Sequence, residues 1–235
     1  MDGKYSKALT VLLIIAIIVI VLILLFLGLR IISNNALRTD YETGADTFIE
    51  NTKNKNNKNN SNNSNTIQNT VNETGVEPIL GIENLLVNNI ASGSTSGRKQ
   101  TYKGFPQVGV IEIPKTKLKC PILEEASKSA IEVAVGIYEG VGLNKVGNTT
   151  IAGHNYNNGT FFSDNNLIEI GDKIYITDED GTKVTYIVYH KVVVTSSDST
   201  YFGRDTEGKR EITLDTCHRV GLETENRLLI LAREE

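Results

Sequence analysis

Thr213-Leu214-Asp215-Thr216-Cys217 and Arg227-Leu228-Leu229-Ile230-Leu231 are two strand-like runs that decide the fold of the last part of this 235-residue chain. The first run ends on a cysteine and the second begins with an arginine. If the nine residues between them form the loop of an antiparallel hairpin, the end of one strand lies beside the start of the other. A thiol and a guanidinium then converge, and such a pair can attack and polarise a carbonyl group.

A third run, Thr149-Thr150-Ile151-Ala152-Gly153-His154-Asn155, ends a strand-like segment on a histidine. A free cysteine has a pKa near 8.5, so at neutral pH its thiol needs a partner that takes the proton. His154 is the best candidate for this acid/base role. His218 directly follows Cys217 and points to the opposite face of an extended chain, whereas His190 lies inside a long strand-like run.

These motifs, Ala152-Gly153-His154-Asn155, then Thr213 to Cys217, then an arginine ten residues on, resemble those of the sortases, the cysteine transpeptidases of Gram-positive cell surfaces. The resemblance covers roughly residues 101 to 235. It implies that Cys217 attacks the backbone carbonyl after the threonine of an LPXTG-like sorting signal carried by a surface protein. His154 would then protonate the leaving amine, and an amine of a peptidoglycan precursor or of another protein would resolve the thioacyl enzyme.

Arg227 is expected to donate hydrogen bonds to the substrate carbonyl and to stabilise the oxyanion, because an arginine is a permanent cation. The resemblance also implies that Thr216 lines the floor of the substrate groove and that the loop from Thr195 to Arg210 borders it. Rivals for the arginine role remain, namely Arg204, Arg210, Arg219 and Arg233.

Two other functions stay open. One is a membrane-tethered binding domain that has kept the fold and lost turnover, since an arbitrary cysteine is more often a small buried apolar residue than a nucleophile. The other is a cysteine hydrolase, which would pass the acyl group to water. Lack of an aromatic lid motif and of a carboxyl-terminal apolar span argues against a pilin polymerase, so a class A or class D-like enzyme is favoured.

Residues 8 to 29 form an almost unbroken apolar run, long enough to cross a hydrocarbon core of about 30 Å. A cleavable signal peptide has a shorter apolar region and a small-residue cleavage site, so a retained anchor is favoured. We therefore expect a cytoplasmic tail over residues 1–7 and a transmembrane anchor over 8–30. Lysines precede the span and arginines follow it, so charge indicates orientation only weakly. The resemblance favours an extracellular catalytic domain.

Residues 31–100 are predicted to be a flexible linker. Ten of the twenty residues from Asn51 to Thr70 are asparagine, and such a stretch has little apolar surface to offset the entropy of ordering. A coil of about 60 residues would reach on the order of 40 to 45 Å from the membrane.

Residues 101–235 are predicted to form the catalytic domain, an all-β barrel of eight strands with one or two short helices, one of them near Ser127 to Val135. Expected strands are 109–113, 121–123, 136–138, 148–153, 173–177, 183–194, 211–217 and 227–232. The eight-stranded barrel is also what the resemblance implies.

The formal net charge of −4 leaves no basic footprint for nucleic acid. Two cysteines are too few for a disulfide framework or a zinc site, and Cys120 is expected to be a small buried residue. No cofactor is expected. Some sortases bind calcium, and Glu124, Glu125 and Glu207 are candidate ligands, although acidic surface residues are usually only solvated.

Overall fold

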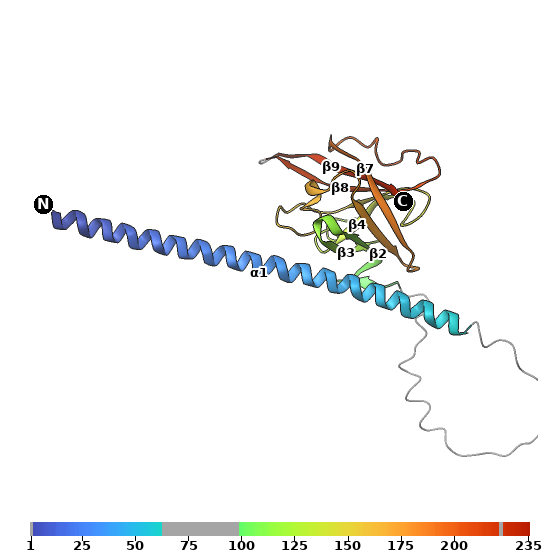
Figure 1. The fold of residues 1–235 in the computed structure, drawn as a ribbon, viewed down its shortest axis with the longest axis horizontal. Coiled ribbons are helices and arrows are strands. Elements are labelled where there is room, and N and C mark those ends of the chain that lie inside the picture. The colour runs from blue at the N-terminus through green and yellow to red at the C-terminus, as the bar shows by residue number, and fades with distance from the viewer. Residues whose placement is uncertain (1, 63–98, 221–222) are drawn as a thin grey trace, which may run out of the picture.

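The computed structural model describes residues 2–62, 99–220 and 223–235, and for residues 2–8, 58–62, 219–220 and 223–225 it describes the backbone only. A long helix lies alongside a compact barrel of strands (Figure 1). The elements in chain order are α1 (Asp2–Asn62), β1 (Thr101–Tyr102), β2 (Phe105–Ile113), η1 (Pro114–Thr116), β3 (Leu118–Leu123), β4 (Val135–Gly140), β5 (Gly147–Ala152), η2 (Asn165–Leu167), β6 (Lys173–Asp178), β7 (Lys183–Thr195), β8 (Arg210–Val220) and β9 (Glu223–Glu234), where η marks short 3₁₀ helices.

Eight of these strands close into a barrel. They follow one another in the order β2, β3, β4, β5, β8, β9, β7 and β6, and β6 pairs again with β2, while β1 pairs only with β2. Closure leaves none of the eight strands as an open sheet edge. The predicted eight-stranded barrel is therefore confirmed, and each expected strand lies in or overlaps an observed one.

Alternation along β8 separates the barrel core from the site. Ile212 and Leu214 point inward and belong to the main hydrophobic core. Successive side chains of a strand point to opposite faces, so the intervening residues share the outward face. That outward row runs along the strand as Glu211, Thr213, Asp215 and Cys217.

Two local predictions differ from the structure. The segment near Ser127 to Val135 is a turn, in which the amide of Ile131 donates to the carbonyl of Ser127 over 3.0 Å without a longer helix following. The two short helices are instead η1 and η2. The loop between the last two strands is also shorter than the expected nine residues, since β8 continues to Val220 and β9 starts at Glu223. Continued pairing satisfies backbone hydrogen-bonding groups that a long loop would leave to solvent.

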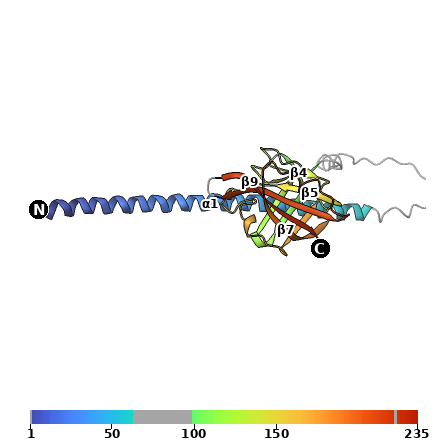
Figure 2. The ribbon, with the colours of Figure 1, turned by 90° about the horizontal axis from the view of Figure 1, so that it is seen from above.

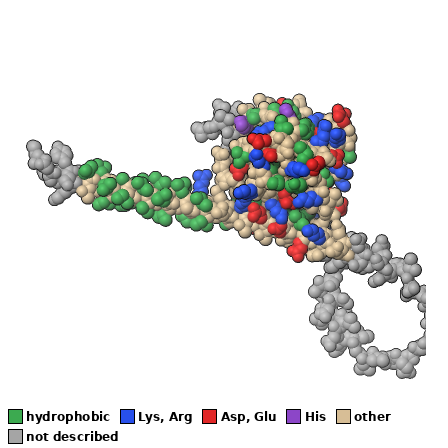
Figure 3. All heavy atoms as spheres, in the orientation of Figure 1, with side chains coloured by type: hydrophobic (Ala, Val, Ile, Leu, Met, Phe, Trp, Pro, Cys, Tyr) green, Lys and Arg blue, Asp and Glu red, His purple; other side chains and the backbone are tan. Residues whose placement is uncertain are grey.

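Helix α1 contains a stretch long and apolar enough to cross a membrane, and that stretch is exposed in the isolated chain (Figure 3). The same helix continues without a break beyond it and runs along the barrel, as Figure 2 shows from above. The prediction of a flexible linker is therefore wrong for residues 31–62. The rest of the predicted linker, residues 63–98, lies outside the described residues.

The physical reason is an apolar stripe that the polar composition hides. Tyr41, Ala45 and Phe48 are spaced by four and three residues, which puts them on one face of a helix, and at most 2% of each is exposed. Tyr41 joins the barrel core, while Ala45 and Phe48 pack with Val110 of β2. Burial of this stripe stabilises helix in a region whose asparagine content alone predicted disorder.

Candidate active site

Cys217 and Arg227 face each other across the β8–β9 pair. They are direct partners in the antiparallel register, so their side chains stand on the same face of the sheet. This is the juxtaposition that the two strand-like runs predicted. Among the described residues, however, the hydrogen-bond partner of the Arg227 guanidinium is a carboxylate, Asp215, two residues before Cys217.

The Asp215–Arg227 pair is bidentate. Nε of Arg227 donates to Oδ1 over 2.8 Å, and Nη2 donates to Oδ2 over 2.7 Å. The carboxylate side chain is 3% exposed and the arginine side chain 31% exposed. Burial opposes the charge on Arg227, but the hydrogen bonds and the charge of Asp215 outweigh it and raise the pKa of the guanidinium. The arginine is thus a fixed cation, held by two of its nitrogens.

A small cleft of about 70 Å³ opens beside this pair. Arg227 and Asp215 line it, together with the aromatic rings of Tyr138 and Phe202, whose centroids are 5.5 Å apart. Ser196 and Asp198, from the loop after β7, line it as well. Nη1 of Arg227 takes no part in the bond to Asp215, so this nitrogen can donate to a group that enters the cleft.

The parallel pairing of β5 with β8 leads the chain to His154 at the Cys217 end of β8. Ala152 is the register partner of Asp215, so the same register continued by two residues brings His154 level with Cys217. Past the end of β5 the chain stays tied to β8, because the amide of Gly153 donates to the carbonyl of Asp215 over 3.1 Å. The three predicted residues therefore gather at one end of the β5, β8 and β9 strands.

Asn155 is a residue that sequence reasoning left without a role. Its side-chain amide donates to the backbone carbonyl of Cys217 over 3.0 Å, and its Oδ1 accepts from the amide of Asn157 over 3.0 Å. The residue after the histidine therefore holds the strand position of the cysteine. Its presence in the quoted motif Ala152-Gly153-His154-Asn155 was the only signal for it.

Glu132 and Tyr156 surround the imidazole of His154. The rings of Tyr156 and His154 are 4.8 Å apart, and the Tyr156 hydroxyl donates to Oε2 of Glu132 over 2.7 Å. Oε1 of the same carboxylate lies 3.3 Å from Nε2 of His154, an ion-pair distance. This nitrogen is buried, and no described residue forms a well-aligned hydrogen bond with it.

This arrangement also sets the ionisation of its members. The hydrogen bond from Tyr156 lowers the pKa of Glu132, with a smaller effect from His154. Burial, with the bond to Glu132, raises the pKa of Tyr156 to about 12. At neutral pH the carboxylate is therefore charged and the phenol is a proton donor. Neither residue was predicted from the sequence. Glu132 lies in the turn that was predicted to be a helix.

Thr216 does not line a groove, contrary to the sequence prediction. Its side chain is fully buried, and its hydroxyl donates to the carbonyl of Gly153 over 2.7 Å. As an even-numbered residue of β8 it faces inward, opposite to Asp215 and Cys217. Its observed contact joins β8 to the end of β5.

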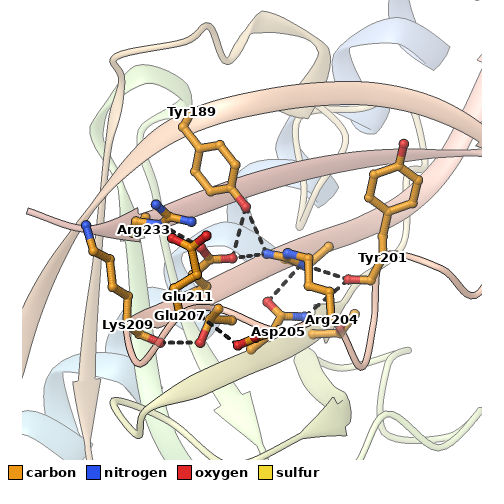
Figure 4. Close-up of polar contacts among 12 residues, drawn as sticks. Tyr189, Tyr201, Arg204, Asp205, Glu207, Lys209, Glu211 and Arg233 are labelled. Carbon is orange, nitrogen blue, oxygen red and sulfur yellow. Dashed lines mark hydrogen bonds and ion pairs between the residues drawn. The ribbon is translucent and has the colours of Figure 1, made fainter.

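Glu211 organises the other end of the outward row of β8 (Figure 4). Its Oε1 accepts from Nε of Arg233 over 2.6 Å, and its Oε2 accepts from the hydroxyl of Tyr189 over 2.9 Å and from Arg204. Arg204 also donates to the carbonyl of Tyr201 over 2.5 Å, in the loop of residues 196–209. This cluster fixes that loop above the strand.

Most of the other arginines considered for the role of Arg227 form ion pairs elsewhere. Arg204 and Arg233 are bound to Glu211, and Arg210 pairs with Glu234 over 3.0 Å. The side chain of Arg219 lies outside the described residues. Of the arginines whose side chains are described, Arg227 is the one that lines the cleft beside the Cys217 strand position.

The remaining histidines and the second cysteine lie elsewhere. The ring of His190 stacks on Tyr201 at 6.3 Å, and His218 pairs in register with Asn226 on the inward-facing side of β8. Cys120 is fully buried, which raises the pKa of its thiol to about 12. Its burial agrees with the structural role that its sequence context indicated.

Calcium binding stays a prediction. Across residues 2–62, 99–220 and 223–235 no three His, Cys, Asp or Glu side chains gather as a metal site. Of the candidate ligands, Glu124 pairs with Lys99. Glu207 sits in the turn that precedes β8, where its amide donates to Asp205 over 2.8 Å (Figure 4).

Comparison with known proteins places this geometry in a family. A model of the sortase domain matches residues 111–235. Among curated proteins, Sortase A of Bacillus anthracis is 35% identical over 112 residues, which are 47% of this chain and 51% of that protein. The match thus spans about half the length of this relative.

Solved structures agree on the fold. Sortase A from Corynebacterium diphtheriae, in a lid mutant, superposes with a TM-score of 0.51 at 28% identity, covering 56% of this chain and 71% of that one. A lid mutant of Streptococcus agalactiae Sortase C1 has the same TM-score at 20% identity, covers 61% of this chain and 74% of that one, and supports the fold alone. With a sortase-domain match over more than half of its residues and a closed eight-stranded barrel of the same kind, the chain belongs to the sortase family.

Proposed function

We propose that this protein is a membrane-anchored cysteine transpeptidase that cleaves an LPXTG-like sorting signal after its threonine and transfers the acyl group to an amine. The amine belongs to a cell-wall precursor or to another protein. Membership of the sortase family supports an enzyme of this kind, since sortases are transpeptidases. The class, A or D-like, and the sorting motif are parts of the proposal.

Acylation uses three side chains in the proposed mechanism. The Cys217 thiol gives its proton to His154, and the sulfur attacks the threonine carbonyl carbon. Nη1 of Arg227 donates to the carbonyl oxygen, on which negative charge develops. The tetrahedral intermediate then collapses, the C–N bond breaks, and the leaving nitrogen takes the proton from His154, which leaves a thioester on Cys217.

Transfer reverses these roles. The incoming amine attacks the thioester carbonyl, its proton passes to His154, and Arg227 again stabilises the oxyanion. The C–S bond then breaks and the sulfur recovers the proton as the free thiol. No cofactor is consumed, and one amide bond replaces another.

The single observation that carries the proposal is the register of three strands. β8 and β9 pair Cys217 with Arg227, and β5 ends at Ala152, opposite Asp215 and two residues before His154. A thiol, an imidazole and a guanidinium from three strands meet only if this register holds. The cleft supports the role of Arg227 alone, because Arg227 and Asp215 line it and neither Cys217 nor His154 does.

Location is part of the same proposal. The apolar stretch of α1 would cross the cell membrane once, with residues 1–7 in the cytoplasm and the barrel on the extracellular side. The partners would be surface proteins that carry sorting signals, together with the amine acceptor.

The test is transfer of a sorting peptide by the purified full-length protein in detergent. A fluorogenic LPXTG peptide is mixed with the protein with and without an added oligoglycine amine, and products are identified by mass spectrometry. We expect a thioester adduct on Cys217 and an amide product that needs the amine. Cys217→Ala and His154→Ala should abolish both, whereas Cys120→Ala, a matched cysteine removal outside the site, should retain them.

Other outcomes separate the alternatives. Free acid as the sole product, whatever the amine, would make the protein a hydrolase. If peptide binds without an adduct on Cys217, the protein is a binding domain. Either result would refute transpeptidation.

A further inference from the structure

We infer that helix α1 is a rigid strut, which holds the barrel with its His154 and Cys217 end turned toward the lipid headgroups. This inference rests on the proposed membrane anchoring and deepens the proposed function, because it restricts the enzyme to peptide bonds presented close to the bilayer. The interaction surface is the barrel end that carries the site. Its partner is the bilayer in which the same chain is inserted.

Contacts along α1 fix the direction of the barrel. Near the apolar stretch, Asn34 meets the loop after His154: its side-chain nitrogen donates to the carbonyl of Asn158 over 3.3 Å, and Nδ2 of Asn158 donates to its Oδ1 over 3.2 Å. Tyr41 then contacts Phe161 of the same loop, with ring centroids 5.7 Å apart. The loop that begins at His154 therefore lies beside the membrane-proximal part of the docked helix.

The opposite end of the barrel lies at the opposite end of the docked segment. Asn56 donates to the carbonyl of Asp180, in the turn between β6 and β7, over 2.8 Å. Asn34 and Asn56 are separated by about 33 Å along a helix that rises 1.5 Å per residue. The His154 loop and the β6–β7 turn thus mark two ends of the barrel, and the first is nearer the apolar stretch.

The pictures agree with this order. In Figures 1 and 2 the ends of β8 and β9 that meet around residue 220 point to the side from which the N-terminal part of α1 extends. The carboxyl terminus of the chain lies at the other side. Cys217 lies three residues before the end of β8, and Arg227 lies four residues after the start of β9. Both are therefore near the first of these ends.

The apolar stretch ends almost where docking begins. Large apolar side chains are exposed on α1 as far as Ile32, which is 66% exposed, and Asn34 already contacts the barrel. Two residues of helix are about 3 Å of rise. From Leu9 to Ile32 the helix extends about 36 Å, slightly more than the hydrocarbon thickness of about 30 Å. The barrel must therefore begin at the headgroup layer.

Docking is strong enough to make the helix a strut. Between the two ends, Tyr41, Ala45 and Phe48 are buried against the barrel. Polar contacts flank this stripe: Arg38 donates to the carbonyl of Lys117, and Lys119 pairs with Asp46. Buried apolar residues flanked by ion pairs on a continuous helix leave no hinge between the span and the barrel over residues 33–56.

Fluorescence quenching by lipid tests the orientation. The full-length Cys217→Ser protein, with a single Leu167→Cys or Val146→Cys substitution, is labelled with bimane and placed in nanodiscs whose lipids carry a headgroup nitroxide. Leu167, beside the His154 loop, and Val146, in the turn before β5, are 52% and 59% exposed. Cys120 is fully buried and should not be labelled. We expect several-fold stronger quenching at position 167 than at position 146.

A cross-link provides the second measurement. In the Cys217→Ser protein, Asn34→Cys with Asn158→Cys should form a disulfide under mild oxidation in nanodiscs, while Asn34→Cys with Val146→Cys should not. Ala45→Asp puts a charge into the buried stripe and should abolish both the cross-link and the difference in quenching. Circular dichroism checks whether the Ala45→Asp variant folds. If it does not fold, the cross-link measured in the protein with an unchanged Ala45 still tests the orientation.

Equal quenching at the two positions, or the absence of the cross-link, would overturn the strut. Both measurements use a protein without its nucleophile, so they are independent of transpeptidation. Conversely, a protein that fails to transfer peptide but shows the quenching difference would refute the proposed function and leave the orientation intact. Failure to co-float with vesicles would overturn the anchoring, and the inference with it.

Discussion

The two ends of the outward face of β8 each hold a buried carboxylate, but the two carboxylates are satisfied differently. Glu211 accepts from Arg233, Arg204 and the Tyr189 hydroxyl, so both of its oxygens are occupied by groups that the fold supplies. Asp215 is bound by Arg227 through two nitrogens, and a third nitrogen of that arginine is left for the cleft.

The arginines around Glu211 hold a loop and a strand together, whereas Arg227 stands in register with Cys217 and lines a cleft. Around Glu211 two cations hold one anion, and one of them fixes the loop of residues 196–209. Around Asp215 one anion holds one cation in a defined plane next to Cys217. An oxyanion stabiliser must be preorganised, must keep a free donor and must stand beside the nucleophile, and Arg227 is the arginine that is both held by a carboxylate and paired in register with Cys217.

The largest difference between the two ends is expected when each arginine is replaced in turn. Arg227→Ala should reduce kcat for the sorting peptide by about 10²–10³, which is the usual cost of losing one oxyanion donor. Arg233→Ala should change kcat by no more than a few-fold, because Arg233 contacts Glu211 and not the cleft. Steady-state kinetics on purified full-length variants measures both. Similar losses in the two variants would show that the ends of the strand are not functionally distinct.

Stability should show the reverse order. Glu211→Ala leaves two arginines without their buried anion, and breaking such a network typically costs about 3–5 kcal/mol of unfolding free energy. Urea unfolding measures the change. The exposed pair Lys183–Glu112 provides the control, since Lys183→Ala removes a surface ion pair worth about 1 kcal/mol or less. An equal cost in the two variants would mean that the Glu211 cluster is no anchor of the fold.

Acid should weaken the Glu211 cluster. Burial alone would raise the pKa of Glu211, but hydrogen bonds from Arg233, Tyr189 and Arg204 outweigh it and lower the pKa. A carboxylate whose pKa is lowered in the folded state contributes stability above its unfolded value of about 4.3, and that contribution is lost as the pH falls through the folded value. The stability difference between wild type and Glu211→Gln should therefore shrink between about pH 5 and pH 3. A difference in unfolding free energy between wild type and Glu211→Gln that stays constant with pH would contradict the lowered pKa of Glu211.

The fourth prediction concerns the orientation of Arg227. Asp215→Asn keeps the shape of the side chain but replaces one acceptor oxygen with a donor, so the bidentate contact becomes a single one. We expect kcat to fall about tenfold, equivalent to about 1.4 kcal/mol, with KM nearly unchanged, because the arginine is needed in the transition state. Arg227→Lys should lose activity even though Asp215 is present, because a lysine ammonium cannot make the bidentate contact with that carboxylate. A change confined to KM would assign Asp215 to substrate binding instead.

Much of this comparison could be predicted from the sequence, but not the carboxylates. The alternation of Ile212 and Leu214 with polar residues predicted a strand, and its pairing with the run from Arg227 predicted where Cys217 would lie. Asp215 carried no signal of its own, because in the chain it is only a spacer between two threonines. Its role depends on which residue stands diagonally opposite, and that depends on the register of β9.

The other residues that the sequence did not predict correctly have different causes. Glu132 lies 22 residues before His154, and only the folded turn brings them together. Thr216 was expected in a groove because the family resemblance implied it, yet the alternation of strand faces buries it. The docked part of α1 was missed because composition averages over a window, whereas Tyr41 and Phe48 act through their spacing on one helix face. The contact of Glu132 is tertiary and no local pattern encodes it, whereas strand alternation at Thr216 and helical spacing at Tyr41 and Phe48 are local patterns that composition alone does not show.

The smallest expected effect concerns the hydrogen bond from Tyr156 to Glu132, which resembles the one from Tyr189 to Glu211 but lies beside His154. Tyr156→Phe removes the hydroxyl that donates to Glu132 but keeps the ring beside the imidazole. The hydrogen bond from Tyr156 is the main reason that the pKa of Glu132 is lowered, so its loss should raise that pKa and leave the carboxylate less firmly placed beside Nε2 of His154. We expect kcat to fall two- to fivefold, or about 0.4–1 kcal/mol, with the acidic limb of the pH–rate profile shifted upward. Tyr175→Phe, on β6 and away from the site, is the control. If Tyr156→Phe leaves the pH profile of kcat where it was, Glu132 does not position the histidine and the two residues only pack against it.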